Sequence, residues 1–209
     1  MSAITHNIHS ICPEERKLLQ VVNDLKNGKV ILYPTDTGFA LGCQLSNKVA
    51  IKRIRQMRNL SEKHEMTFIC SNLSNISEYA KVNNKAYKFL KSLIPGTFTF
   101  ILPASKMVPK YAQSPSKRTI GIRLPESMLA KELIHLLGEP IISISAKIEG
   151  EEYYYDEEII ETYRNMVDIV IISDSYHFNG ESTIIDMTND DYQILRIGSG
   201  IEEVEEALS

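Results

Sequence analysis

The sequence has few cysteines and lacks the segments that direct a chain into or across a membrane. Its three cysteines, Cys12, Cys43 and Cys70, are an odd number without a Cys-x-x-Cys pair. This pattern argues against a disulfide framework or a zinc site. No apolar run approaches the roughly 18–20 residues that span a bilayer, and residues 1–10 lack the charged start and apolar stretch of a secretory signal. We expect a cytoplasmic protein with no membrane partner.

Several common catalytic and phosphate-binding motifs are also missing. The chain has no G-x-x-x-x-G-K-[ST] loop and no strand-linked G-x-G-x-x-G, so any phosphate group must be held by individual side chains. Its five histidines show no H-E-x-x-H spacing, and no G-x-S-x-G elbow accompanies the serines. We therefore predict no dedicated catalytic nucleophile and no tightly held metal.

The chain also lacks an excess of positive charge. Lys and Arg total 23 against 27 Asp and Glu, a formal net charge of -4, which excludes a bulk-basic nucleic-acid coat. Any phosphate site is then local. With 209 residues, 43% of them hydrophobic and 24% charged, the sequence can bury a sizeable core, so global disorder is excluded as well.

Helical and strand patterns alternate along the chain. Periodicity and capping predict helices over 13–28, 47–58, 74–81, 84–93 and 127–137, and strands over 29–33, 66–70, 97–102, 119–123, 141–145, 168–172, 182–186 and 192–197. The strand at 29–33 is expected to end in a loop at Pro34. The short turn over 187–191 predicts an antiparallel pair. We expect an α/β (α+β) fold, a mixed sheet covered by helices.

Three predicted strands end in hydroxyls or an arginine where an apolar run would otherwise continue: Tyr33–Thr37, Thr119–Arg123 and Ser143–Ser145. Polar groups at strand ends often converge on a ligand crevice, although such hydroxyls also serve turns. Four cations lie near predicted element ends, Arg58, Arg123, Lys147 and Arg196, and each is a candidate for phosphate binding or a solvated surface charge. The polar, aromatic segment 146–155 is either a flap or an acidic surface loop.

The stretch Val30–Cys43, VILYPTDTGFALGC, resembles the opening signature of the YrdC-like family, the threonylcarbamoyl-AMP synthases. The resemblance continues through Pro95–Thr99, Gly121–Pro125, Ser143–Ala146, Ser182–Ile184 and Arg196–Gly198. It covers roughly residues 13–200, which predicts one YrdC-like domain between an N-terminal extension, 1–12, and a C-terminal tail, 201–209. We expect no additional C-terminal domain of the kind that longer relatives carry, and 146–155 is the candidate substitute lid.

The resemblance implies a twisted mixed sheet with a concave, cationic cleft that combines threonine, bicarbonate and ATP into threonylcarbamoyl-AMP. A separate tRNA threonylcarbamoyl transferase complex would use the product to modify tRNA. Carried over by motif, Thr35 and Ser143 would hold threonine and Arg123 would pair with its carboxylate. Nucleotide and phosphate binding would fall to Arg58, Thr119, Ser145, Lys147, Thr183 and Arg196. Mg²⁺ is expected to bridge the ATP phosphates rather than to sit in a protein cage.

Two departures from the synthase motifs leave the function open. Where synthases carry Lys-x-Arg, this chain has Arg58-Asn59-Leu60, and where they carry Ser-x-Asn it has Ser145-Ala146-Lys147. At these positions the chain is most similar to the YciO branch of the family. The chain is either a threonylcarbamoyl-AMP synthase of nucleotidyltransferase type, or a module that binds nucleotide, tRNA or double-stranded RNA, or acts on the adenylate, without efficient synthesis.

Overall fold

Strands from the whole length of the chain join into a single sheet in the computed structural model, which describes residues 2–62, 64–148, 150, 155–174 and 178–209. The strands are β1 (Ile4–Asn7), β2 (Ile31–Thr35), β3 (Gly38–Gln44), β4 (Thr67–Ile69), β5 (Phe98–Pro103), β6 (Thr119–Arg123), β7 (Ile141–Ser145), β8 (Ile169–Ile172), β9 (Thr183–Asp186) and β10 (Gln193–Arg196). The helices are α1 (Glu15–Lys26), α2 (Lys48–Met57), α3 (Leu73–Tyr79), α4 (Asn84–Leu93), α5 (Met128–Leu137), α6 (Asp156–Tyr163) and α7 (Ile201–Leu208), with a 3₁₀ turn η1 (Lys110–Ala112).

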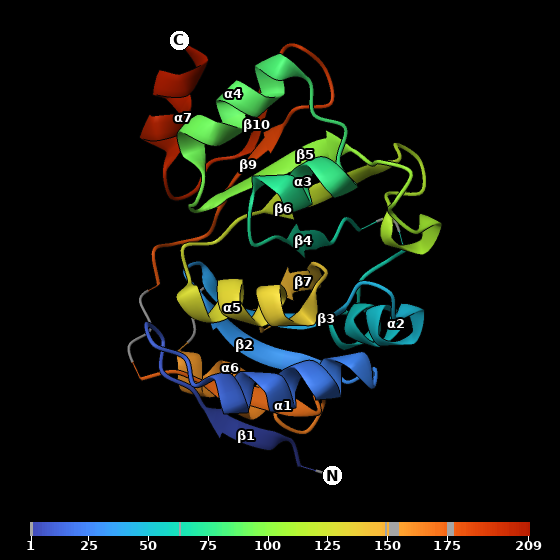
Figure 1. Ribbon diagram of the computed structural model, residues 1–209, viewed down its shortest axis with the longest axis vertical. Helices are drawn as coiled ribbons and strands as arrows, with labels where there is room; N and C mark the ends of the chain where they lie inside the picture. Colours follow the sequence, from blue (N-terminus) through green and yellow to red (C-terminus); the bar gives the residue numbers. More distant parts are fainter. Residues whose placement is uncertain (1, 63, 149, 151–154, 175–177) are drawn as a thin grey trace.

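The sheet is mixed, with the strand order β1-β8-β2-β3-β7-β4-β6-β5-β9-β10. Antiparallel pairs join β2 to β3, β3 to β7, β7 to β4, β6 to β5 and β9 to β10, and the other neighbours are parallel. The pairing of β9 with β10 confirms the antiparallel connection predicted from the turn at 187–191. Figure 1 shows α4 and α7 at one end of the long axis and α1, α6 and β1 at the other.

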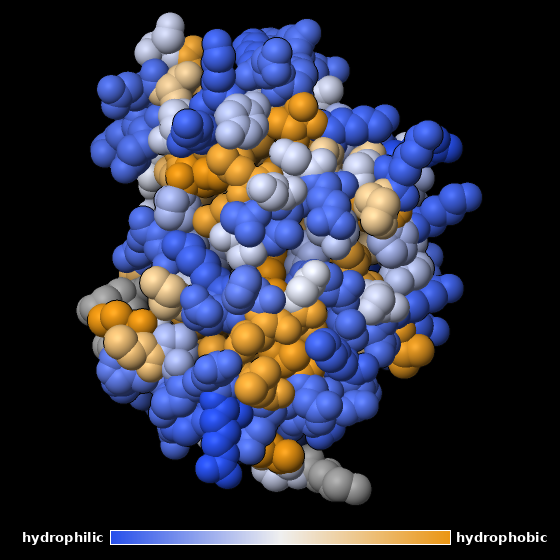
Figure 2. Space-filling view, viewed as in Figure 1, coloured by the Kyte–Doolittle hydropathy of each residue, from blue (hydrophilic) through white to orange (hydrophobic). Residues whose placement is uncertain are grey.

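Alternation along the strands divides the apolar side chains between two layers. One layer takes Leu32, Phe68, Phe100 and Ile122 and packs under helices α2, α3, α4, α6 and α7. The other takes Ile31, Ile141 and Ile169 and packs under α1 and α5. Successive strand residues point to opposite faces, so each strand contributes to both layers. Figure 2 shows apolar side chains gathered where α1 and α5 meet.

The second layer covers only part of its sheet face, and this leaves room for a site. Thr67, Ile69 and Arg123 share that face, since Thr67 pairs with Gly121 and Ile69 with Arg123 in the parallel register of β4 and β6. Ile69 belongs to the apolar cluster under α1 and α5, whereas Thr67 and Arg123 lie beyond it. The polar residues of β4, β5 and β6 on this face therefore border open space instead of a helix.

The predicted elements form close to their expected bounds, with one correction and several additions. The loop expected after Pro34 is only a two-residue turn, Asp36–Thr37, because the chain then enters β3, in which Phe39, Leu41 and Cys43 alternate toward the first apolar layer. Strand β1 and helices α6 and α7 lie where no element is predicted. The side chains of β1 are mostly exposed, so its strand state comes from backbone pairing with β8.

The structure bears only in part on the proposed flap and on the expected absence of a membrane-spanning segment. Residues 149 and 151–154 of the proposed flap at 146–155 lie outside the described residues. Among the helices that the structure describes, none has the length and apolar character needed to cross a membrane.

Candidate functional site

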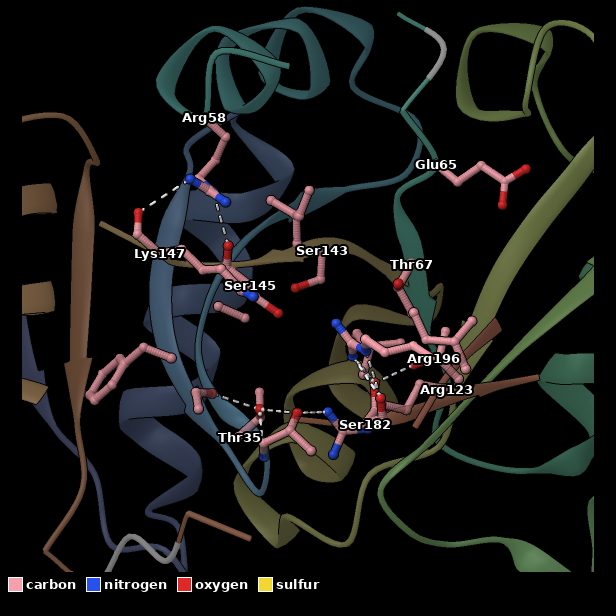
Figure 3. Close-up of a pocket in the computed structure, with 18 of the residues that line it drawn as sticks. Thr35, Arg58, Glu65, Thr67, Arg123, Ser143, Ser145, Lys147, Ser182 and Arg196 are labelled. Carbon is pink, nitrogen blue, oxygen red and sulfur yellow. Dashed lines mark hydrogen bonds between the residues drawn. The ribbon is translucent and has the colours of Figure 1, made fainter. Parts of the chain in front are cut away.

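A pocket of about 250 Å³ opens on the uncovered part of the sheet face, and we call it the strand-end pocket. Most of the predicted site residues line it: Thr35, Arg58, Arg123, Ser143, Ser145, Lys147 and Arg196. They come from β2, β6, β7, β10 and the ends of α2 and β7, segments far apart in the chain. Figure 3 shows Arg58, Ser145 and Lys147 on one side of the pocket and Arg123, Ser182 and Arg196 on the other.

Arg123 is a buried cation held by a buried carboxylate. Its side chain is 6% exposed and that of Asp36 is 8% exposed, with Nη2 2.7 Å from Oδ1. Nη1 donates to the Thr37 hydroxyl and Nε donates to the Gly96 carbonyl at 3.4 Å. Burial lowers the pKa of the guanidinium, and the Asp36 carboxylate opposes that effect. The Nη2–Oδ1 contact is an ion pair without hydrogen-bond alignment, and both atoms are buried with no other hydrogen-bond partner in the described chain.

The hydroxyls of Thr35 and Ser143 already use their hydrogens inside the protein. Thr35 Oγ1 donates to the Gly38 carbonyl at 2.7 Å. Ser143 Oγ donates to the Leu41 carbonyl at 2.9 Å and accepts from the Tyr33 hydroxyl at 3.0 Å. Burial raises the pKa of Tyr33 to about 12, so Tyr33 stays a donor at neutral pH. Both hydroxyls can then offer only lone pairs to a ligand, which suits an N–H donor.

Arg58 fastens the end of β7 beside the pocket. Its Nε donates to the Ser145 carbonyl at 3.0 Å and its Nη1 donates to the Lys147 carbonyl at 3.2 Å. The Tyr163 hydroxyl donates to the same Lys147 carbonyl at 2.7 Å. Arg58 thus positions the backbone of the Ser145–Lys147 segment, and its guanidinium still lines the pocket.

Lys147 and Arg196 share one carboxylate, that of Glu181. Lys147 Nζ contacts Glu181 Oε1, and Arg196 Nη1 lies 3.0 Å from Glu181 Oε2. Burial alone would raise the pKa of Glu181, but the two cations outweigh it and lower that pKa. Two of the three cations that the sequence assigns to nucleotide and phosphate binding are therefore occupied by a carboxylate of the same protein, and the third is Arg58.

Thr119 and Thr183, also predicted to bind nucleotide, are not among the described residues that line the pocket. The Thr119 hydroxyl donates to Glu65 Oε1 at 2.7 Å, and the Thr183 hydroxyl donates to the Ser199 carbonyl at 2.8 Å. Thr119 therefore contacts a residue that lines the pocket, Glu65, without lining the pocket itself.

The structure adds residues that the sequence patterns do not single out, namely Asp36, His64, Glu65 and Glu181. Asp36 lies between two threonines in the Tyr33–Thr37 motif, and a carboxylate at that position is a sequence signal for a charged site residue. Nothing local marks Glu181, whose partners lie on β7 and β10. Burial, Arg55 and Arg58 lower the pKa of His64, so its imidazole is neutral at pH 7. Within the described residues, no group of three or more His, Cys, Asp or Glu side chains could hold a metal ion.

Comparison with known proteins gives consistent matches over nearly the whole chain. The Sua5/YciO/YrdC family model, whose description reads "Telomere recombination", matches residues 23–198. A Haemophilus influenzae protein is 42% identical over 196 residues, covering 92% of this chain and 94% of that protein. The crystal structure of Escherichia coli YciO has a TM-score of 0.90 at 36% identity, covering 97% of this chain and 99% of that one.

A more distant relative carries a named activity. The threonylcarbamoyl-AMP synthase of Pyrococcus abyssi is 27% identical over 198 residues, covering 93% of this chain and 58% of that protein. A crystal structure of Pyrococcus abyssi Sua5 complexed with L-threonine has a TM-score of 0.89 at 27% identity, covering 99% of this chain and 61% of that one. The mixed α/β fold with its twisted sheet is common to these proteins, and this chain belongs to the Sua5/YciO/YrdC family.

Proposed function

We propose that the strand-end pocket binds L-threonine beside ATP and that the protein forms threonylcarbamoyl-AMP for the modification of tRNA. The amino group of threonine would first attack the carbon of bicarbonate and release water to give a carbamate. A carbamate oxygen would then attack the α-phosphorus of ATP, and pyrophosphate would leave. Such a reaction depends on positioning and on stabilising developing negative charge, so it requires no nucleophilic side chain.

The observation that carries this proposal is the distribution of donors and acceptors around Arg123. The Arg123 guanidinium lines the pocket and suits a carboxylate, and the acceptor-only hydroxyls of Thr35 and Ser143 suit an amino group. An amino acid carries these two groups on adjacent atoms. The L-threonine that is bound in the Sua5 structure supports the same substrate class.

The nucleotide would lie toward Ser145, Lys147 and Arg196. ATP would enter as its Mg²⁺ complex, with the ion bridging phosphates. Arg196 is held in place by Nε and Nη2 bonds to the Ser182 carbonyl at 3.0 and 2.7 Å, so its Nη1 is the atom that can exchange Glu181 for a phosphate oxygen. A tRNA threonylcarbamoyl transferase complex would be the partner that receives the product.

Pyrophosphate release from Mg-ATP, measured with and without threonine and bicarbonate, tests the proposal, with threonylcarbamoyl-AMP followed by mass. We expect release that needs all three substrates. Arg123→Lys should raise the KM for threonine, because a single ammonium cannot reproduce the forked donor. Release that ignores threonine, or none at all, would contradict synthesis.

A second candidate function, binding of nucleotide or RNA or action on the adenylate without efficient synthesis, is favoured by the Lys147–Glu181–Arg196 contacts. Glu181 neutralises charge that a triphosphate would need. Leu60, at the second cation position of the synthases, is not among the described residues lining the pocket and instead lines a different cavity. Retained AMP binding without threonine-dependent turnover would support this candidate, and salt-dependent binding of tRNA would identify an RNA ligand.

Synthase-like residues can be restored to separate the two candidates. If the departures limit synthesis, the double variant Leu60→Arg/Lys147→Asn should raise threonine-dependent pyrophosphate release. Because Leu60 faces the other cavity, most of the gain is expected from Lys147→Asn. If pyrophosphate release is unchanged in the double variant and in the single variant Lys147→Asn, other residues limit the reaction.

A further inference from the structure

A second cavity lies on the far side of the loop that borders the strand-end pocket. It has a volume of about 490 Å³ and lies between α2 and residues 110–115, which include η1. In Figure 1 the yellow-green segment that carries η1 lies beside α2, and the two elements pack together. We call it the α2–η1 cavity.

Four cations line the α2–η1 cavity against one carboxylate. Lys48, Lys52 and Arg55 occur at successive turns of α2 and so share one helix face. Lys110 faces them from η1, and Glu62 is the carboxylate. Within the described chain, none of the four cations has an ion-pair partner within 4.0 Å. In the strand-end pocket, by contrast, three of the four Lys and Arg side chains are paired, namely Arg123, Lys147 and Arg196, and Arg58 binds backbone carbonyls.

Arg55 makes this cavity more than a patch of surface lysines. It is 9% exposed, and its Nη1 donates to the Ser61 carbonyl at 2.8 Å and to the His64 carbonyl at 2.7 Å. Its Nε and Nη2 bond to nothing else in the part of the chain that the structure describes. One side of the fork is anchored, and the remaining donors are preorganised for an anion.

The two cavities share the loop 58–65 as a wall. Arg58, His64 and Glu65 line the strand-end pocket, whereas Leu60 and Glu62 line the α2–η1 cavity. Arg55 holds two carbonyls of this loop, so a group that binds to Arg55 acts on the segment that carries His64 and Glu65.

We propose that the α2–η1 cavity is a second binding site, for a small anion that carries one or more phosphate groups. Unpaired lysines around a half-anchored guanidinium match the several oxygens of a phosphate, and the concave shape favours a compact ligand over an extended polymer. Ile51 and Leu60 add apolar side chains to the lining, and charge contacts are stronger beside apolar groups than in open water. This site stands apart from the proposed synthesis of threonylcarbamoyl-AMP, because none of its lining residues belongs to the strand-end pocket.

Lysine acetylation read by mass spectrometry on the full chain tests the site, with pyrophosphate as the probe and sodium chloride at equal ionic strength as the reference. At about ten times its Kd, pyrophosphate should slow acetylation of Lys48, Lys52 and Lys110 roughly tenfold. Lys88 and Lys91, exposed on α4 outside both cavities, should react equally in the two solutions. Equal acetylation of all five lysines, or equal protection of all five, would overturn the proposal.

A variant pair of matched charge gives a second readout. Calorimetry should show pyrophosphate affinity about tenfold weaker or more in Lys48→Gln/Lys52→Gln and unchanged in Lys88→Gln/Lys91→Gln. Unchanged affinity in both double variants would contradict the site. Protection of these lysines by duplex RNA that pyrophosphate does not reproduce would also overturn it, since the face would then contact a polymer.

Discussion

At the scale of single residues, the site is organised by two carboxylates, each of which holds cations. Asp36 fixes the buried Arg123, and Glu181 lies between Lys147 and Arg196. The first pair is almost fully buried, whereas the Glu181 side chain is 40% exposed. Burial strengthens a charge pair and makes the loss of one partner more costly, so the two carboxylates should respond differently to substitution.

Replacing Asp36 should destabilise the fold strongly. Asp36→Asn keeps the shape but leaves the Arg123 charge unpaired in the interior, which we expect to lower the free energy of unfolding by about 3–5 kcal/mol. Urea denaturation measures this directly. Asp24→Asn is the matched control, because Asp24 pairs with the 37% exposed Lys29 at the same 2.7 Å separation and should cost about 0–1 kcal/mol. Similar losses in the two variants would contradict a special role for the Asp36–Arg123 pair.

Replacing Glu181 should instead improve ligand binding. Glu181→Gln frees Lys147 and Arg196, and we expect about fivefold tighter AMP binding at pH 7 by calorimetry, equivalent to roughly 1 kcal/mol for a partly exposed pair. Glu161→Gln breaks a surface pair with Arg164 and serves as the control for net charge. Weaker AMP binding in Glu181→Gln would mean that the carboxylate helps to hold the ligand.

The Glu181 contacts also predict a pH dependence of stability. The cations lower the pKa of this carboxyl below its ordinary 4.5 in the folded protein. Its contribution is therefore complete above about pH 4.5 and is lost as the pH falls through the lowered pKa. In acid titrations followed by urea denaturation, Glu181→Gln should lose less stability than the wild type between pH 5 and pH 3, taken as an approximate window around these pKa values. The same change of the free energy of unfolding with pH in both proteins would contradict a stabilising role of the Glu181 contacts.

At the scale of elements, β3 allows the pocket to form because it carries Gly42 between two large neighbours. A Cβ at Gly42 would lie 2.8 Å from Ile141 Cγ2 and 2.8 Å from Tyr33 Cε1. Tyr33 is the residue that orients the Ser143 hydroxyl. The tight packing of β2, β3 and β7 at this point thus fixes a group that faces the ligand.

An alanine in β3 should disturb both stability and the site. Gly42→Ala forces Tyr33 or Ile141 to move, so we expect a loss of about 1–3 kcal/mol and weaker threonine binding, measured by thermal unfolding and calorimetry. Gly121→Ala in β6 is the matched control, because its Cβ would meet nothing closer than Thr67 Oγ1 at 3.4 Å. A larger loss in the Gly121 variant than in the Gly42 variant would contradict this account of the packing.

At the scale of the whole molecule, the strand-end pocket joins strands from both halves of the sheet. Thr35 and Ser143 come from β2 and β7, and Arg123 and Arg196 come from β6 and β10, with β4 between these groups. A ligand that touches both groups adds to the links that the Arg123–Asp36 pair and the Lys147–Glu181–Arg196 contacts already make between the two halves. Binding should therefore stabilise the fold as a unit.

Threonine and ATP together should raise the melting temperature. At about 100 times Kd, a ligand of the native state adds roughly 2.7 kcal/mol, which corresponds to about 5–10 °C for a chain of this size. Differential scanning fluorimetry measures the shift, with L-alanine replacing threonine as the control. No shift with any combination of threonine, ATP and AMP would contradict a nucleotide and amino acid site in this pocket.

The amino-acid sequence by itself determined the alternation of helices and strands, the apolar positions of most strands and seven of the residues that line the strand-end pocket. These properties are local, because a period of two or 3.6 residues and a polar strand end can be read within one segment. Phe98, Phe100 and Ile122 were assigned to strands in this way, and all three are buried. The motif around Thr35 also contains Asp36, which is the ion-pair partner of Arg123.

Only the tertiary structure decided which of these residues meet. The strand state of Ile4–Asn7 depends on β8, more than 150 residues away, and the binding of Lys147 and Arg196 to Glu181 depends on the placement of three separate segments. Thr119 and Thr183 have the same polar character as Thr35, yet only Thr35 is among the described residues that line the pocket. Long-range pairing and side-chain direction arise from the packing of the sheet as a whole, and no local pattern contains them.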